Sequence, residues 1–187
     1  MKALRAGGTP LTNACGITLA LDGGASLGVE ILESDIARVR IQPAGGYREP
    51  RTWAIAPMPG LDVEWQGRAR DDRSGFACPA PRVANTPGGV TLQTDSLSLA
   101  LSTEPLALRW TDADGRLLLQ DRASAAYMAS QRTGAVRHYL QREPGDRYYG
   151  LGDKTGPLNL HGRRLRTLAM DALGYDPHGG DPLYKHW

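Results

Sequence analysis

Acidic residues and glycines crowd the end of this sequence, where they could bind a polar ligand. Asp171, Asp176 and Asp181 lie close together, separated by glycines, and Tyr184 follows them. A carboxylate offers two acceptor oxygens to neighbouring hydroxyl groups, and glycine gives a loop backbone its freedom. On residue type alone, an Asp before Ala-Leu-Gly is typical of a loop in solvent. These residues therefore predict an acidic loop without naming its ligand.

The stretch from Gly150 to Gly156 has the glycine content of a phosphate-binding loop but not its spacing. Lys154 follows Asp153, whereas a phosphate loop has Gly directly before its Lys. The dinucleotide-binding pattern fails as well, because its third glycine falls on Thr155. An Asp inside the loop also repels phosphate. We expect a tight glycine turn between two strands here.

The histidines and cysteines do not form a metal or redox motif. Cys15 and Cys78 are far apart in the sequence and neither belongs to a Cys-x-x-Cys pair, so we expect two buried free thiols. Galactose mutarotase chemistry requires two His and a Glu on one sheet for general acid and base work. Only His138 and Glu143 lie well inside the predicted sandwich, which argues against that activity, and we expect His138, on a strand with Val136 and Leu140, to have a packing role. No metal and no organic cofactor is predicted.

Charge and hydropathy exclude several classes of partner. The net charge is +2, which is too small to favour nucleic acid or an anionic membrane. No run approaches the ~18 apolar residues of a membrane span. The first residues, Met1 to Gly8, contain a charge but no apolar core of a secretory signal. The sequence predicts a cytoplasmic protein that binds neither nucleic acid nor membrane.

Apolar and polar residues alternate with a period of two, which is typical of half-buried strands. The arginines at 38 and 40 are expected to face water, and Asp114-Gly115 is expected to form the turn of a hairpin. The apolar faces are expected at Ala37, Val39 and Ile41, at Leu61, Val63 and Trp65, at Leu97, Leu99 and Leu101, and at Leu106, Leu108 and Trp110.

Long connections separate these strands. Segments 42–60 and 71–89 are rich in Gly and Pro, which break central strands, and we expect both to be surface loops. No segment carries apolar residues three and four positions apart over a helical length. Many short strands without helices predict an all-β fold, a two-sheet antiparallel sandwich with little or no helix.

Three blocks near the end resemble glycoside hydrolase family 31, whose members are mostly α-glucosidases and α-xylosidases. They are the Tyr-Gly-Leu-Gly-acid turn at 149–153, the isolated Asp171, and Pro182-Leu183-Tyr184-Lys185. The resemblance implies a large galactose mutarotase-like supersandwich over residues 1–169. It also implies that residues 170–187 are a loop and linker leading to a catalytic (β/α)8 barrel beyond this sequence.

The resemblance also implies a function. Family members hydrolyse α-O-glycosidic bonds with retention, and both catalytic carboxylates come from the barrel, so no catalytic residue is expected here. The Asp at the position of Asp171 accepts hydrogen bonds from sugar hydroxyls, and Asp176, Asp181 and Tyr184 are weaker candidates. The implied partners are the chain's own barrel and α-linked glucosides or oligosaccharides. We expect the 187-residue chain alone to hydrolyse nothing.

Two alternatives from other classes remain. A free-standing carbohydrate-binding module is also an all-β sandwich, and four Trp and seven Tyr supply enough aromatic rings for a sugar-stacking surface. A structural domain that forms homo-oligomers is the second alternative, although the alternation identifies no partner surface.

Overall fold

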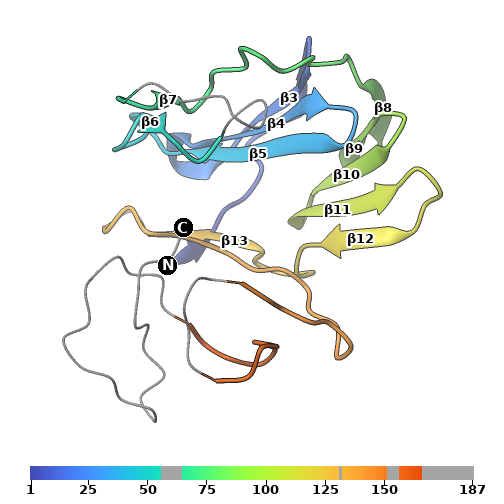
Figure 1. The fold of residues 1–187 in the computed structure, drawn as a ribbon. Coiled ribbons are helices and arrows are strands. Elements are labelled where there is room, and N and C mark those ends of the chain that lie inside the picture. Colours follow the sequence, from blue (N-terminus) through green and yellow to red (C-terminus); the bar gives the residue numbers. More distant parts are fainter. Residues whose placement is uncertain (56–64, 131, 151–155, 166–187) are drawn as a thin grey trace. The chain divides into compact units, whose positions relative to one another are not determined.

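The structure is a computed structural model that describes residues 1–55, 65–130, 132–150 and 156–165. The chain divides into two compact units, Met1–Gln141 and Arg142–Trp187. The described residues form strands and one short 3-10 turn, Asp22–Gly24, with no α-helix among them. The prediction of an all-β fold with little or no helix is confirmed (Figure 1).

One antiparallel sheet has the order β2-β3-β4-β5. Val29 pairs with Val39 in the middle of its longest strand pair, and the apolar side chains of β3 and β4 point to the same side and are buried. The strands are β2 (Leu11–Asn13), β3 (Gly16–Ala20), β4 (Ser26–Glu33) and β5 (Ile36–Gln42).

A second antiparallel sheet has the order β12-β11-β10-β9-β8. Leu97, Leu99 and Leu101 of its central strand are buried, as their alternation with serines predicted. Asp114-Gly115 forms the turn between β11 and β12, which confirms the expected hairpin. The strands are β8 (Arg82–Thr86), β9 (Gly89–Gln93), β10 (Leu97–Thr103), β11 (Leu106–Asp112) and β12 (Leu117–Gln120).

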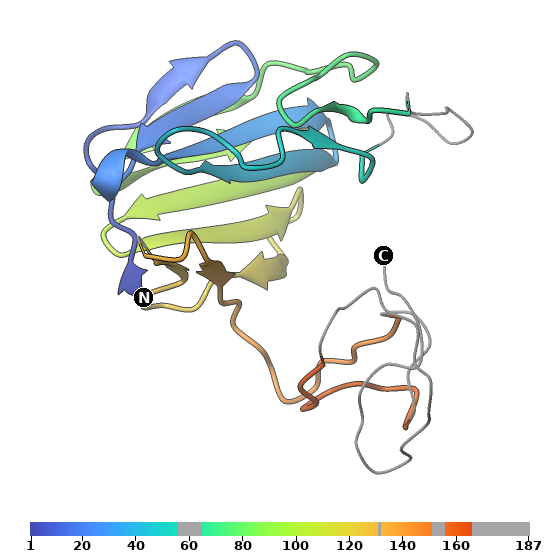
Figure 2. The same ribbon diagram turned by 90° about the vertical axis from the view of Figure 1, so that its left-hand side faces the viewer.

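The two sheets share one hydrophobic core, so the first unit is a sandwich (Figure 2). Ile17 and Leu27 from the first sheet and Leu92 and Leu99 from the second are completely buried in this core. Two small sheets complete the unit. They consist of β1 (Lys2–Ala3), β13 (Tyr127–Ala129) and β14 (Val136–His138), and of β6 (Arg51–Thr52) with β7 (Arg68–Ala69).

Close packing between strands requires glycine at two positions. A Cβ on Gly89 would overlap the carbonyl group of Leu101 on the neighbouring strand, and a Cβ on Gly16 would overlap that of Val29. Both contacts involve backbone atoms, which cannot rotate away as a side chain can. Any larger residue at either position therefore requires the strand pair to separate.

Four expectations from the sequence were wrong. Cys78 is only partly buried, although two buried thiols were expected. Arg38 is buried, although alternation placed it in water, because it pairs with Glu30 across the sheet. Trp65 is 93% exposed, so it does not lie on a buried strand face; Leu61 and Val63 lie outside the described residues. Strands also lie within both segments expected to be loops, β6 within 42–60 and the edge strand β8 within 71–89.

Candidate functional site

The residues predicted to contact sugar lie outside the part of the chain that the structure describes. Asp171, the weaker candidates Asp176, Asp181 and Tyr184, and the predicted domain boundary after residue 169 all fall in segment 166–187. The expected glycine turn also falls largely outside, because 151–155 are not described. The acidic sugar-binding loop therefore remains a prediction.

The beginning of the same stretch is described within the second unit. The Leu160 amide donates to the carbonyl of Tyr148 at 2.7 Å, and the Tyr148 amide donates to Asn159 Oδ1 at 3.0 Å. The Tyr148 hydroxyl donates to Asp146 Oδ2 at 3.1 Å, and its ring lies 5.9 Å from that of His161. Tyr148 thus joins two segments that are separated in sequence, 146–150 and 156–161.

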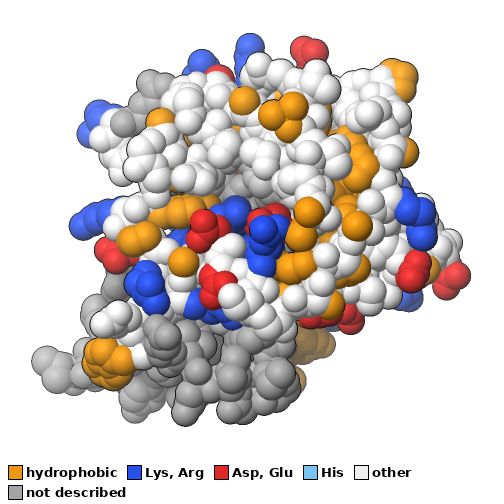
Figure 3. Space-filling view, turned by 90° about the horizontal axis from the view of Figure 1, so that it is seen from above, with side chains coloured by type: hydrophobic (Ala, Val, Ile, Leu, Met, Phe, Trp, Pro, Cys, Tyr) orange, Lys and Arg blue, Asp and Glu red, His pale blue; other side chains and the backbone are white. Residues whose placement is uncertain are grey.

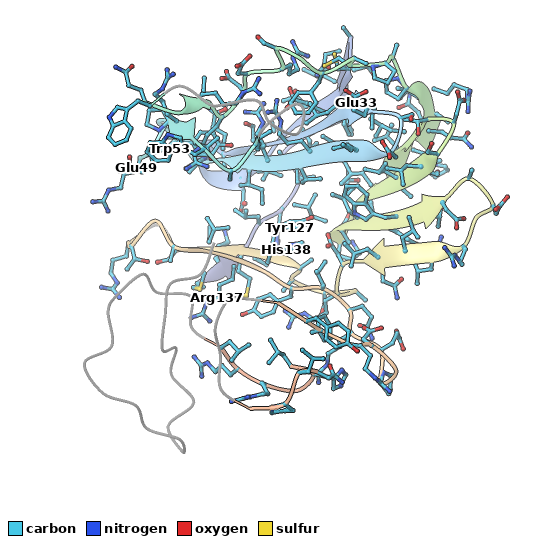
Figure 4. All side chains as sticks on the ribbon, in the orientation of Figure 1. Glu33, Glu49, Trp53, Tyr127, Arg137 and His138 are labelled. Atoms are coloured by element: carbon cyan, nitrogen blue, oxygen red, sulfur yellow. The ribbon has the colours of Figure 1, made fainter. Side chains whose placement is uncertain are left out.

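A second polar group, Asp121, Tyr127 and His138, lies in the first unit. His138 Nε2 lies 2.6 Å from Asp121 Oδ1, and Asp121 Oδ2 accepts the amide of Leu108 at 2.8 Å. The rings of Tyr127 and His138 stack with a centroid distance of 4.6 Å and an interplanar angle of 4° (Figure 4). The Asp121 side chain is only 1% exposed, so the hydrogen bonds with the Leu108 amide and with His138 replace those with water that its carboxylate has lost.

This cluster shifts the acidity of the tyrosine. Burial, and then the hydrogen bond to the Asp121 carboxylate, raise the pKa of Tyr127 well above its usual value of 10. The phenol therefore stays protonated and keeps donating to Asp121. Within the cluster there is a single imidazole, that of His138, and no Glu.

Galactose mutarotase chemistry needs more than this cluster supplies. An acid and a base must act on the same sugar from two positions, whereas His138 has its Nε2 engaged by a buried carboxylate. We interpret the group as structural, because its hydrogen bonds and ring contact connect the ends of β12, β13 and β14 to β11. The expected packing role of His138 agrees with its stacked ring, and the bond to Asp121 adds to it.

A buried ion pair network lies on the first sheet. Glu30 Oε2 lies 3.0 Å from Nη2 of Arg38 and 3.0 Å from Nη2 of Arg40. Arg38 also donates to the carbonyl oxygens of Asp71 and Asp72, at 3.2 and 3.0 Å. The network therefore attaches the segment after β7 to the outer face of the sheet, and its groups are occupied by one another rather than by a ligand.

The described residues offer neither a metal site nor a membrane-spanning helix. No group of three or more His, Cys, Asp or Glu side chains there is arranged to hold a metal ion. That same portion of the chain contains no helix of the length and hydrophobicity needed to cross a membrane. Figure 3 shows one face of the molecule, on which acidic and basic side chains are interspersed.

Two tryptophans are conspicuous on the surface. Trp53 is 66% exposed and Trp65 is 93% exposed, and the indole Nε1 of Trp53 donates to the carbonyl of Trp65 at 3.0 Å. Figure 4 shows Trp53 beside β6, at the margin of the first unit. Scattered exposed apolar residues are normal, but two large exposed indoles, one of which donates to the backbone of the other tryptophan, form a surface that could bind a ligand.

The sequence matches a known family and a known enzyme. Residues 26–187 match the family model described as the glycosyl hydrolase 31 N-terminal galactose mutarotase-like domain. Alpha-glucosidase 2 of Bacillus thermoamyloliquefaciens is 32% identical over 105 residues, which is 55% of this chain and 13% of that protein. The chain therefore spans about an eighth of the length of this relative.

Solved structures share the fold. A glycoside hydrolase family 31 dextranase from Flavobacterium johnsoniae matches all of this chain and 21% of its own, with a TM-score of 0.75 and 17% identity. An α-xylosidase of the same family from Xanthomonas citri matches 81% of this chain and 16% of its own, with a TM-score of 0.56 and 24% identity. Since the family model covers most of the sequence, the chain belongs to the glycosyl hydrolase 31 N-terminal galactose mutarotase-like domain family.

Proposed function

We propose that this chain is the N-terminal, non-catalytic domain of a retaining α-glucosidase, and that it packs on a catalytic barrel and lines the substrate cleft. The observation that carries the proposal is the family match over residues 26–187, which extends through the predicted sugar-binding loop. The name of the 32% identical relative, alpha-glucosidase 2, supports an α-glucoside as the substrate.

In this proposal Asp171 contacts the substrate directly. Its carboxylate accepts hydrogen bonds from hydroxyl groups of the sugar, while Asp176, Asp181 and Tyr184, which flank the same loop, are weaker candidates for contact with the substrate. A hydrogen bond to a charged group contributes about 1.5 to 3 kcal/mol, which is about 10- to 100-fold in an equilibrium constant. The reaction itself uses two carboxylates of the barrel, roughly 5 to 5.5 Å apart in a retaining enzyme.

The test is a substitution in the polypeptide that carries this chain together with its barrel. Asp171→Ala is expected to lower kcat/KM for a chromogenic α-glucoside about 10- to 100-fold, and Asp171→Asn less, because the amide keeps one acceptor oxygen. Asp114→Asn, in the turn between β11 and β12, is the matched control and should leave kcat/KM unchanged. A loss below twofold for Asp171→Ala would contradict the role in the cleft.

The 187-residue chain alone should be inactive on the same substrate, because it contributes neither catalytic carboxylate. Turnover by the purified chain that disappears on replacement of a sandwich carboxylate would place the chemistry in this domain. That result would overturn the non-catalytic role even if Asp171 bound sugar.

A second candidate function rests on the exposed tryptophans. A carbohydrate-binding module binds sugars by stacking their apolar faces on aromatic rings, and the rings of Trp53 and Trp65 are exposed to solvent. In that case the isolated chain should bind maltose, seen as saturable quenching of tryptophan fluorescence that Trp53→Ala abolishes. Absence of binding by the isolated chain favours the role beside a barrel.

A further inference from the structure

The two cysteines are brought to the same end of β4 by the fold. The carbonyl of Cys15 accepts the amide of Ile31 at 2.7 Å, and the amide of Cys78 donates to the carbonyl of the next residue, Leu32, at 2.9 Å. Successive residues of one strand therefore bind the backbones of both cysteines. Neither cysteine is in a disulfide, so both are free thiols.

Their thiols also interact electrostatically. Burial, followed by the charge of Cys15 and a hydrogen bond with its side chain, raises the pKa of the Cys78 thiol. The guanidinium of Arg73 donates to the sulfur of Cys15 at 3.1 Å. Cys15 therefore interacts both with a cation and with the second thiol.

The two sulfurs differ in access. Cys15 is buried, whereas Cys78 is only partly buried and lies in a segment attached to the sheet by the Ala77 amide, which donates to Glu33 Oε1 at 2.9 Å. A reagent in solution therefore reaches Cys78 first. A group attached there lies next to the sulfur that Arg73 holds.

We propose that Cys15 and Cys78 are a site of reversible oxidation, where a small-molecule disulfide such as oxidised glutathione converts two thiols into an intrachain disulfide. The Cys78 thiolate attacks one sulfur of glutathione disulfide and releases one glutathione as thiolate. The Cys15 thiolate then attacks the Cys78 sulfur of the mixed disulfide and releases the second glutathione. Two protein thiols are oxidised, one glutathione disulfide is reduced to two thiols, and both protein protons pass to solvent or to the released thiolates.

Arg73 has a defined place in this sequence of steps. Its guanidinium stabilises negative charge on the Cys15 sulfur, which is the nucleophile of the second step. The finished bond closes a loop of roughly 60 residues and restricts the unfolded chain. It fastens the segment that contains Arg73 and Cys78 to the start of β3.

The test uses the native chain, oxidised glutathione at pH 8, rapid alkylation and mass spectrometry. The expected product has lost two hydrogen atoms, yields a cross-linked peptide pair containing Cys15 and Cys78, and melts about 10 °C higher than the reduced chain. Cys15→Ser should instead accumulate a glutathione adduct at Cys78. The Arg73→Gln variant should also form the glutathione adduct at Cys78, but should convert it to the Cys15–Cys78 cross-link several-fold more slowly than the native chain.

Two results would overturn the proposal. One is a wild-type chain that keeps a stable glutathione adduct without forming the cross-link. The other is a chain whose thiols cross-link only after unfolding in urea, which would show that the native fold does not bring the sulfurs together. Because both results come from the wild-type chain, misfolding of a variant cannot produce them.

Discussion

Replacing Glu30 by Gln should expose how much the buried ion pair network contributes to stability. The side chains of Glu30 and Arg38 are 10% and 7% exposed, and one carboxylate oxygen, Oε2, lies 3.0 Å from Nη2 of both Arg38 and Arg40. Glu30→Gln keeps the shape of the side chain and removes its charge. Arg38 is then left as a buried cation without its anion.

The size of the stability loss depends on the hydrogen bonds that Arg38 retains in the variant. Removing one partner of a fully buried ion pair costs about 3 to 5 kcal/mol. Arg38 keeps its hydrogen bonds to the carbonyls of Asp71 and Asp72, and the Gln amide oxygen can still accept one bond, so the lower value applies. A loss of about 3 kcal/mol corresponds to a melting temperature roughly 6 to 12 °C lower for a chain of this size.

The assay is thermal and urea unfolding of the chain followed by circular dichroism. The matched control is Asp95→Asn, which breaks an ion pair with Arg82 in which the Asp95 side chain is 89% exposed. Exposed pairs contribute about 0 to 1 kcal/mol, so the control should change stability little. The double variant Glu30→Met, Arg38→Met should regain at least half of the loss, because the buried cation is removed with its anion and Arg40, whose side chain is 21% exposed, keeps access to water. Equal effects of Glu30→Gln and Asp95→Asn would refute this reasoning.

Three further predictions concern single sites in the first unit. Gly89→Ala should unfold the chain or lower its melting temperature strongly, because the new Cβ overlaps the Leu101 carbonyl, whereas Ala100→Gly should have a small effect. Hydrogen bonds from the hydroxyl and amide of Ser74 hold the pKa of Asp72 at about 2, so Ser74→Ala should shift it toward 3.8 in an NMR titration. Since that pKa is lowered by folding, the stability that Asp72 contributes is present above pH 3.8 and is lost as the pH falls toward 2. Burial and the hydrogen bond to Asp121 raise the pKa of Tyr127 well above 10, so Tyr127→Phe should leave unchanged the tyrosinate absorbance that the native chain develops around pH 10.

The alternation of side chains predicted the central strands correctly, because burial on one face decides which residues can occupy it. Leu97, Leu99 and Leu101 are buried while Ala100 is exposed, as period two requires. The same alternation wrongly predicted that Arg38 faces water. Its burial depends on an ion pair with Glu30 across the sheet, which the alternation does not reveal. Glu30 on the neighbouring strand was a visible signal, but only the register of β4 with β5 shows that the two residues face each other.

The clusters around Asp121 and around the two cysteines could not be predicted from the sequence pattern. Asp121, after Gln120 at the end of a strand, has the appearance of an ordinary turn residue, and its partners Tyr127 and His138 lie on other strands. The interaction of Cys15 with Cys78 depends on how the segment after β7 crosses the sheet, and no local pattern encodes that path. Asp171 was selected by resemblance to a family and not by its residue type, since a loop aspartate alone is uninformative.

The most direct test of the central claim is a crystal structure of the polypeptide that includes the barrel, with an α-linked oligosaccharide bound. We predict that the sandwich packs beside the barrel and that a carboxylate oxygen of Asp171 lies within hydrogen-bond distance, about 2.5 to 3.2 Å, of a sugar hydroxyl. Asp171 in solvent, with the sugar bound entirely by barrel residues, would contradict the account.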